Sequence, residues 1–426
     1  MLPIAYLRDH PDEVRRGLLR RGETGSLDDV LRLDERRRAI LTEGQTLREQ
    51  RNVANETIKR AGRPTEEQRG ELRSVSERIK TLDGDLASVE RTLDDLLLRL
   101  PNLPHADVPD GPDERSNVEY KRCGALPNFD FMPRPHWEIG EQLGILDLEA
   151  GVKLAGARFY VTRGLGARLQ RALVSFFLDF HVQRQGYSEV STPYVVKSAA
   201  MMGSGKLPKF ADDAYCLKED DLWLNPTAEV PLTDLHRDEI LSVDQLPLCY
   251  TAYCPSWRRE AGSAGRDTRG TIRLHQFHKV EMYKFTRPED SYAEHDRMIV
   301  DAEEVVTALG LPYRALRLCA GDLGFTATAT VDLEVWLPGV REYKEISSVS
   351  NCEAFQSRRA NIRFRRAAGE RPEFVHTLNG SGLPIDRTFA AILENYQQVD
   401  GSVRVPEVLQ PYMGVEVIPI PPDLAV

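Results

Sequence analysis

The stretch Ser256–Phe285, SWRREAGSAGRDTRGTIRLHQFHKVEMYKF, predicts two β-strands joined by a long turn. The runs 246–260 and 271–285, on either side of the turn, have the aromatic and aliphatic content of strands. Glycines at positions 262, 265 and 270 lie between the two runs and suit a reversal of the chain. The sequence therefore predicts an antiparallel hairpin, with sheet structure on both sides of it.

Alternation along these strands is expected to gather chemical groups on one face of the hairpin. Arg258 would share a face with Glu260, and Phe277 would share one with Lys279 and Glu281. A guanidinium group binds phosphate, an aromatic ring stacks on adenine and a carboxylate binds an ammonium group. The opposite, apolar face would carry Ile272, Leu274, Val280 and Met282. A salt-bridged hairpin in solvent is the alternative that the charges alone leave open.

Length and composition favour a globular protein of two domains. The chain has 426 residues, of which 41% are hydrophobic and 29% are charged, and its net charge of -10 argues against indiscriminate coating of nucleic acid. No run of about 18 apolar residues predicts a membrane span, and the charged N-terminus does not resemble a signal peptide. Six cysteines without a CxxC pair favour reduced thiols. We expect a cytoplasmic protein with no membrane partner.

The N-terminal part has the repeat of a coiled coil. The run AGRP at 61–64 separates two helical segments and permits a reversal, so we expect an antiparallel helical hairpin. A dimerisation coiled coil and a lever that reaches an extended partner are both compatible with the pattern. The second segment carries the seam Leu72, Val75, Ile79, Leu82, Leu86, Val89, Leu93, Leu96 and Leu100. The first segment and the tip carry Arg36, Arg37, Arg38, Arg48, Arg51, Lys59, Arg60 and Arg63, which suit phosphate contacts.

A linker separates this arm from the rest of the chain. Residues 101–117 are rich in Pro, Asp and Gly and have no periodicity, and we place the domains at 1–105 and 106–426. The second domain mixes amphipathic helices with strands, which is an α+β pattern. The stretches at 203–206 and 380–385 lack the spacing of a P-loop and of a dinucleotide fingerprint, so neither nucleotide cradle is predicted.

Two further segments carry candidate chemistry. Glu345 and Ser348 are close enough along a predicted strand to hold a hard cation through oxygen ligands. Arg387 follows a glycine-rich stretch, 378–383, that we interpret as a turn into a helix. An arginine near a helix start is electrostatically unfavourable, which points to an anionic ligand. A surface salt bridge is the ordinary alternative for each of these residues.

Four motifs carry a resemblance to a known family. They are PTAEVPL at 226–232, the opening stretch at 256–285, KEISSVSNCEAFQSRRANIRFR at 344–365 and LNGSGLPIDRTFAAILENYQQVDGSVRVPEVLQPYM at 378–413. They resemble the seryl-tRNA synthetases of the bacterial type, which are class II aminoacyl-tRNA synthetases, and the resemblance covers nearly the whole chain. It implies an antiparallel sheet of six or seven strands flanked by helices and preceded by a coiled-coil arm. It also implies ATP-dependent activation of L-serine as seryl-adenylate and transfer to tRNA(Ser), with tRNA(Sec) as a further acceptor.

The resemblance also assigns roles to residues. Catalysis would depend on Arg258, Glu345 and Arg387. ATP would bind to Arg258, Arg259, Glu260, Leu274, Phe277, Glu345, Ile346, Ser347, Ser348 and Arg387. Serine would bind to Thr227, Ala228, Glu229, Arg258, Glu281, Asn379 and Ser381. Glu345 and Ser348 would hold Mg2+ through ATP, and Arg266, Arg269, Arg37, Arg48 and Arg51 would contact tRNA. The stretch 185–194, QGYSEVSTPY, resembles the element that forms the class II dimer interface, so a homodimer is implied.

The chain departs from the family pattern at a few places. Lys206 stands where Gln is common, Ala329-Thr330-Val331 replaces a typical Lys-Thr-Tyr, and Pro384 and Asp386 flank Ile385. Asp386 would add a carboxylate beside Arg387. A ligase that loads an amino acid onto a carrier protein is a second hypothesis, for which the arm would be surplus. A coiled-coil scaffold with an inactive catalytic domain is a third, which predicts losses at the catalytic positions.

Overall fold

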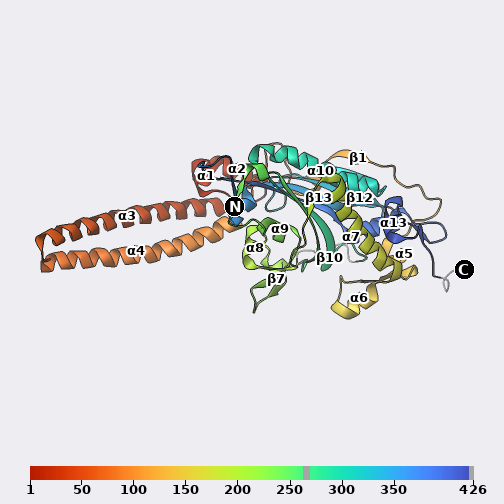
Figure 1. The fold of residues 1–426 in the computed structure, drawn as a ribbon, viewed down its shortest axis with the longest axis horizontal. Helices are drawn as coiled ribbons and strands as arrows, with labels where there is room; N and C mark the ends of the chain where they lie inside the picture. The colour runs from red at the N-terminus through yellow and green to blue at the C-terminus, as the bar shows by residue number, and fades with distance from the viewer. Residues whose placement is uncertain (262–268, 422–426) are drawn as a thin grey trace. The chain divides into compact units, whose positions relative to one another are not determined.

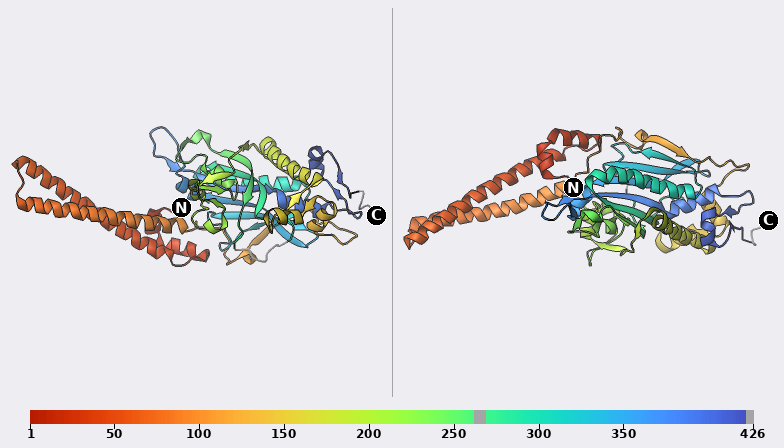
Figure 2. Two further views of the ribbon diagram at one scale, coloured as in Figure 1. Left: turned by 90° about the horizontal axis from the view of Figure 1, so that it is seen from below. Right: turned by 45° about the horizontal axis from the view of Figure 1, so that its top comes forward.

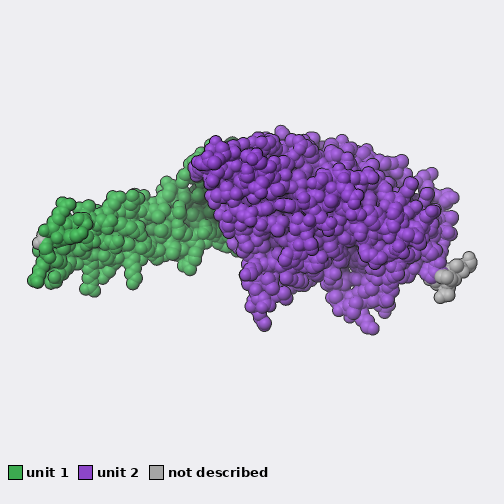
Figure 3. All heavy atoms as spheres, viewed as in Figure 1, with its two compact units in different colours: residues 1–101 green, residues 102–426 purple. Residues whose placement is uncertain are grey.

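The computed structural model describes residues 1–261 and 269–421. The chain forms two compact units, residues 1–101 and residues 102–426 (Figure 3). Residues after the boundary belong to the second unit through specific contacts. Asn102 Nδ2 donates to the carbonyl oxygens of Thr326 and Cys352 at 2.9 and 3.0 Å, and the His105 amide donates to Thr328 O at 2.9 Å.

The N-terminal unit is built around a pair of long helices. Two short helices, α1 (Ile4–Asp9) and α2 (Pro11–Arg20), precede α3 (Ser26–Ala61) and α4 (Glu66–Arg99), which run as a hairpin (Figure 1). Gly62 ends α3 with φ +89°, a conformation that glycine adopts readily. Thr65 then starts α4 with a capping box, in which its hydroxyl accepts from the Gln68 amide.

The antiparallel direction of the hairpin follows from its contacts. Ile40 packs with Leu82 and Val89 between the helices, as the coiled-coil seam predicts. Three ion pairs join the helices: Arg37 to Glu90, Glu43 to Arg78 and Arg48 to Asp83. Arg37, the earliest of the three on α3, pairs with the latest residue on α4, whereas Glu43 and Arg48 pair with residues 7 to 12 positions earlier on α4, as in an antiparallel pair.

An eight-stranded sheet organises the described part of the second unit. Its seven longer strands are antiparallel, and only the short edge strand β4 pairs in parallel, with β9. Antiparallel sheet structure was expected from the sequence, and the strand count exceeds the expected six or seven because the two-residue edge strand β4 adds to the seven longer strands. The order is β1 (Val118–Cys123), β11 (Tyr313–Arg317), β12 (Ala329–Leu337), β13 (Glu342–Glu353), β16 (His376–Pro384), β10 (Gln276–Thr286), β9 (Leu248–Trp257) and β4 (Ser188–Glu189).

Three helices cover one face of this sheet and enclose the main core. They are α7 (Gly164–Gln185), α10 (Ser291–Ala308) and α12 (Ile385–Asn395), and Figure 1 and Figure 2 show α7 and α10 lying along the strands. Val280 and Met282 of β10 point into this core, as the predicted alternation requires. On the opposite face of β10, Phe277, Lys279 and Glu281 face a cavity, whereas Tyr283 and Phe285 pack in a second apolar cluster.

The glycine-rich stretch before Arg387 is a strand, and the predicted turn is wrong at this point. Residues His376–Pro384 form β16, and α12 begins directly after it at Ile385. A Cβ atom on Gly382 would lie 2.4 Å from His181 Nε2 of α7, so the glycine lets helix and strand approach closely. Similarly, β10 begins at Gln276, so residues 271–275 are not the strand that the sequence predicted.

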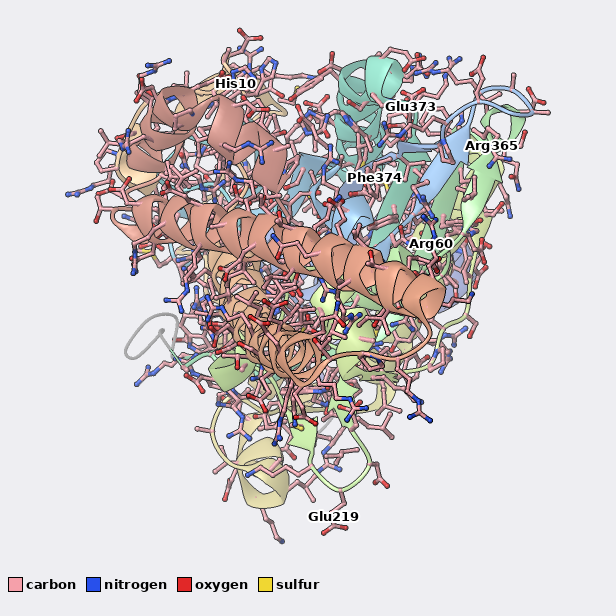
Figure 4. All side chains as sticks on the ribbon, turned by 90° about the vertical axis from the view of Figure 1, so that its left-hand side faces the viewer. His10, Arg60, Glu219, Arg365, Glu373 and Phe374 are labelled. Carbon is pink, nitrogen blue, oxygen red and sulfur yellow. The ribbon has the colours of Figure 1, made fainter. Side chains whose placement is uncertain are left out.

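Smaller elements surround the sheet. They include a three-stranded sheet of β8 (Ile240–Ser242), β14 (Arg363–Arg365) and β15 (Glu373–Phe374), on which Arg365, Glu373 and Phe374 are marked in Figure 4. The other helices are α5 (His136–Gln142), α6 (Leu148–Ala155), α8 (Ser198–Gly203), α9 (Glu229–Asp234), α11 (Phe355–Ala360) and α13 (Gln410–Met413). The remaining strands are β2 (Leu146–Asp147), β3 (Val161–Thr162), β5 (Val195–Lys197), β6 (Cys216–Leu217), β7 (Leu222–Leu224), β17 (Val403–Arg404) and β18 (Val417–Ile418). Among the described residues, none of the helices is both long and apolar enough to cross a bilayer.

Candidate active site

A cavity of about 490 Å³ lies on the polar face of the sheet. Strands β10, β13 and β16 supply much of its wall, together with the segments that precede β10 and follow β16. The residues predicted for the site that line it are Glu229, Arg258, Glu260, Leu274, Phe277, Glu281, Glu345, Ser348, Asn379, Ser381 and Arg387. Side chains from segments more than a hundred residues apart therefore meet in one space.

Arg258 lies directly after the last residue of β9. Its amide donates to His275 O at 2.9 Å, which extends the pairing of the hairpin beyond the strand. Its guanidinium Nε donates to Pro226 O at 3.2 Å, and its Cζ lies 5.0 Å from the centroid of the Phe277 ring. This places a fixed positive charge beside an aromatic surface, an arrangement that suits a nucleotide.

The polar face of β10 continues from Phe277 to an ion pair. Lys279 and Glu281 follow at alternate positions, and their side chains contact each other. Thr227 Oγ1 donates to Glu281 Oε2 at 3.3 Å. Burial raises the pKa of the Glu281 carboxyl, and the Lys279 ammonium opposes that rise. The carboxylate is thus a buried acceptor suited to an ammonium group or a hydroxyl.

Glu229 begins α9 and forms a second buried acceptor in the cavity. Its two carboxylate oxygens accept from different donors: Oε1 from Gln356 Nε2 at 2.7 Å, and Oε2 from Lys206 Nζ at 2.7 Å. Burial by itself would raise the pKa of the Glu229 carboxyl, but the Lys206 ammonium holds that pKa below its usual value. Glu229 is thus a buried carboxylate, 6% exposed, whose charge is balanced by the Lys206 ammonium.

A β-bulge explains why Glu345 and Ser348 both face the cavity. Residues three apart on a regular strand lie on opposite faces. Here Glu345 pairs with Glu334 and Ser347 pairs with Leu333, so Ile346 is an extra residue in β13. Because of the bulge, Ser348 lies on the same face of β13 as Glu345, and both residues line the cavity. Ile346 instead lies in the core, and Ser347 Oγ donates to Ser381 O at 2.6 Å.

These oxygens are compatible with a magnesium ion that also binds phosphate. Mg2+ prefers carboxylate and hydroxyl oxygens and usually keeps ligands from the nucleotide. No cluster of three or more His, Cys, Asp or Glu side chains suited to a metal occurs within residues 1–261 and 269–421. Protein oxygens alone therefore do not complete a metal site here, and a fit exists only when a phosphate supplies further ligands.

Arg387 lies in the first turn of α12 at the edge of the same cavity. Its Nη1 donates to Glu345 O at 2.7 Å and lies 3.3 Å from Glu345 Oε2, and its Nε donates to Ile272 O at 3.1 Å. The expected carboxylate beside it has other partners. Asp386 accepts from the Tyr160 hydroxyl and from the His278 amide, the latter at 2.6 Å. Asp386 therefore anchors the start of α12 to β10, and the ion pair of Arg387 is with Glu345.

Some predicted residues lie beside the cavity without lining it. Thr227 contacts Glu281 from behind, and Ala228 is buried in a separate apolar cluster. Arg259 lies over the Tyr215 ring at 4.8 Å and donates to Ala214 O. Arg269 is exposed, whereas Arg266 lies outside the described residues.

The arginines predicted to contact tRNA on the arm differ in their surroundings. Arg37 and Arg48 make ion pairs across the hairpin, with Glu90 and Asp83. Arg51 lines a depression of about 500 Å³ between the two helices, near the tip of the hairpin. Arg60 lies at the far end of α3 (Figure 4).

Several lining residues were not among the predicted site residues. Three of them are cations that pair with a predicted carboxylate, a signal that sequence alone left unused. Arg273 lies 2.9 Å from Glu260, and Lys206 and Lys279 pair with Glu229 and Glu281. The other lining residues outside the predicted set, which do not share this signal, are Asp213, Thr271, Ile272, Gly324, Pro384 and Asp386.

Comparison with known proteins places both units. Residues 1–104 match the model of the seryl-tRNA synthetase N-terminal domain, and residues 214–396 match that of the class II tRNA synthetase core domain (G, H, P, S and T). The chain is 56% identical over 422 residues to the serine--tRNA ligase of Roseiflexus sp. (strain RS-1), which covers 98% of this chain and 99% of that protein. It is 54% identical to the serine--tRNA ligase of Geobacillus kaustophilus, over 97% of this chain and 99% of that protein.

A solved structure gives the same result for the fold. The crystal structure of seryl-tRNA synthetase from Pyrococcus horikoshii complexed with ATP superposes with a TM-score of 0.93 at 38% identity. The superposition covers 98% of this chain and 99% of that chain. The likeness therefore extends over both compact units and over every strand that lines the cavity.

Proposed function

The chain belongs to the seryl-tRNA synthetase family, with a class II synthetase fold, and on that premise we propose that it attaches L-serine to tRNA(Ser) in an ATP-dependent reaction. The observation that carries the proposal is the gathering of Arg258, Phe277 and Glu281 on one cavity wall, with Glu345 and Arg387 on the same cavity. The first three offer sites for a phosphate, an adenine and an ammonium group. Glu345 and Arg387 would flank the outer phosphates of ATP.

In the first step the serine carboxylate attacks the α-phosphorus of ATP. Seryl-adenylate forms and pyrophosphate leaves. Arg258 neutralises the serine carboxylate and the α-phosphate as they approach, Phe277 and Leu274 hold the adenine, and Arg387 holds the γ-phosphate. Arg259 and Glu260 support the nucleotide, as do Ile346 and Ser347 through the backbone of β13. No protein nucleophile is required, because positioning and charge stabilisation carry the rate.

Mg2+ would be held by Glu345 and Ser348 together with phosphate oxygens. When bound, it neutralises negative charge on the phosphates. Glu345 also pairs with Arg387 at 3.3 Å, so the same carboxylate orients the arginine that faces the leaving group. This pairing keeps a positive charge at the pyrophosphate end of the cavity.

Serine is selected by polar groups that need its hydroxyl and its ammonium group. Thr227, Glu229, Glu281, Asn379 and Ser381 surround the proposed place of the amino acid, with Ala228 behind them. Alanine would leave buried hydroxyl partners unpaired, a mismatch worth about 1–3 kcal/mol per group. Threonine would bring an extra methyl group into the same space.

In the second step a hydroxyl of the terminal adenosine of tRNA attacks the seryl carbonyl and releases AMP. We propose that the α3–α4 hairpin binds the long variable arm of tRNA(Ser) through phosphates and sugars. The candidates are Arg51, which lines the depression between the two helices of the hairpin, and Arg269, which is exposed. Arg266, which the resemblance also assigns to tRNA, lies outside the described residues. Arg37 and Arg48 would first have to exchange their carboxylate partners for phosphates.

Further parts of the proposal concern partners and location. We propose that tRNA(Sec) is also serylated, because its recognition would use the same arm. We propose a homodimer that forms through the segment 185–194, where β4 is an edge of the sheet. All six cysteines, each within the described part of the chain, are free thiols, which supports a cytoplasmic location. Exchange of pyrophosphate into ATP, tested with each amino acid in turn, examines the activation step directly.

A further inference from the structure

Lys206 contacts a carboxylate that the proposed function assigns to the amino acid. Its Nζ lies 2.7 Å from Glu229 Oε2, and both residues line the cavity beside Glu281. The backbone of Lys206 is fixed just after α8, because its amide donates to Met201 O and its carbonyl accepts from the Phe210 amide. The backbone of Lys206 is therefore held in place, and its side chain is the part that can change position.

Glu229 is held by one rigid donor and one movable donor. Gln356 is fully buried, and its Nε2 donates to Ser204 O at 3.1 Å as well as to Glu229 Oε1. Its Oε1 accepts from Tyr283 and Thr377 at 3.0 and 2.7 Å, so the amide has no freedom to leave. The Lys206 side chain is 24% exposed and makes its ion pair through a flexible stem. Only the lysine can yield its place on this carboxylate.

An adjoining cavity gives the Lys206 side chain space to occupy when it leaves Glu229. This second cavity, of about 270 Å³, shares Lys206, Glu229 and Asp213 with the first and is also lined by Met201 and Phe210. Lys206 thus lines both spaces. Asp213 also lines both, and its carboxylate, whose Oδ1 accepts from the Ala261 amide at 3.2 Å, has oxygen lone pairs left for an ammonium group.

We propose that Lys206 sets the affinity of the site for its amino acid, because its ammonium group occupies Glu229 in the free enzyme and is displaced by the α-ammonium group of the substrate. This inference rests on the proposed function, which surrounds the amino acid with Glu229 as well as Glu281, and it adds that the α-ammonium group contacts Glu229 beside Glu281. Two ammonium groups on one carboxylate oxygen would repel each other at close range in a buried site. The substrate therefore binds only as Lys206 turns toward Asp213, and that exchange weakens its binding.

The test compares Lys206→Gln with the wild-type protein. Glutamine keeps a donor for Glu229 and removes the competing charge. In pyrophosphate exchange, KM for serine is expected to fall about tenfold, the scale of one charge-assisted hydrogen bond, while KM for ATP stays within about twofold. Calorimetric titration with L-serine alone is expected to give the same change in Kd. An unchanged or raised KM and Kd for serine would overturn the inference.

Two further variants keep the test decisive. Lys206→Met retains the length of the stem without the charge, and it replaces the first variant if that one does not fold. Lys209→Gln removes a neighbouring charge that lines neither cavity and lies 5.8 Å from the Phe325 ring, so its KM for serine is expected to match the wild type. An equal fall in Lys209→Gln would also overturn the inference, because the effect would then be general electrostatics.

The wild-type measurement separates this inference from the proposed function. Failure of the wild type to exchange with serine would contradict the function. The Lys206 comparison would then be made with whichever amino acid the wild type activates, and the ratio of KM values would still decide the role of the lysine.

Discussion

The guanidinium carbon of Arg258 lies 5.0 Å from the centroid of the Phe277 ring, although the two residues come from opposite sides of a long turn. The pairing of β9 with β10 brings them together, since Phe277 is opposite Ser256. One residue after the strand, Arg258 reaches over the ring. The contact joins the phosphate end and the adenine end of the proposed ATP site.

Removal of that guanidinium group is expected to abolish activation. Arg258→Ala should lower serine-dependent pyrophosphate exchange by at least about 100-fold, because one preorganised donor at a developing charge contributes that much. The control is Arg365→Ala, an exposed arginine on β14 whose loss should leave exchange unchanged (Figure 4). Comparable activity in the two variants would remove Arg258 from the site.

The bulge in β13 gives a prediction about magnesium. Ser348→Ala and Glu345→Gln are expected to raise the Mg2+ concentration needed for half-maximal exchange, because each removes an oxygen ligand. Glu345→Gln should also raise KM for ATP, since it loosens Arg387. Titration of exchange with MgCl2 at saturating ATP measures the first effect. A magnesium dependence identical to the wild type in both variants would exclude these oxygens as ligands.

The hairpin gives a prediction that separates the two steps. Replacement of residues 32–98 by a short linker is expected to leave pyrophosphate exchange within about threefold of the wild type, because the cavity is built entirely by the second unit. Charging of tRNA(Ser) should fall by at least about 100-fold, as phosphate contacts supply most of the affinity for RNA. Filter assays with labelled serine measure charging. Charging that survives the deletion would refute a tRNA-binding role for the arm.

Gly382 gives a prediction about stability. Gly382→Ala would place a methyl group 2.4 Å from His181 Nε2 and is expected to lower the free energy of unfolding by about 1–3 kcal/mol. Gly324→Ala is the control, because a Cβ atom there meets no atom within 4 Å. Urea unfolding followed by circular dichroism compares the two. Equal stability of the variants would show that α7 does not press on β16 as described.

Buried histidines give a prediction about pH. Burial lowers the pKa of His181 and of His295, so the folded state binds fewer protons than the unfolded state. The free energy of unfolding should therefore decrease as the pH falls through about 6.5, the unfolded value, by up to about 1.4 kcal/mol per pH unit for each histidine. His181→Gln should flatten this dependence between pH 7.5 and 5.5. A variant with the full wild-type slope would contradict the assignment to His181.

The sequence predicted much of this architecture because the signals were local. The heptad seam, the AGRP reversal and the two runs beside the glycines each depend on neighbours in the chain. The arm formed where expected, and the β9–β10 hairpin formed with strands shorter than the predicted runs. The turn predicted at 378–383 failed for a tertiary reason. Glycine is needed at position 382 because His181 approaches the strand closely there, and no local sequence pattern reports that contact.

The sequence predicted which residues form the site better than it predicted how they are arranged. Strand alternation pointed to Arg258 and Glu281, a place near a helix start pointed to Arg387, and the resemblance then assigned their roles. The bulge that joins Glu345 to Ser348, by contrast, depends on the register with β12. The lysine partners of Glu229 and Glu281 also required the fold, because nothing along the chain links Lys206 to a carboxylate 23 positions away. Sequence patterns do not reveal ion pairs between residues that lie far apart in the chain.

We expect the cavity to activate serine with ATP and to reject the other amino acids. Exchange of labelled pyrophosphate into ATP, run with all twenty amino acids and the full-length protein, measures this selectivity. Exchange should depend on serine, with alanine and threonine at or near background. Exchange of equal rate with any other amino acid, or none with serine, would exclude the proposed activity.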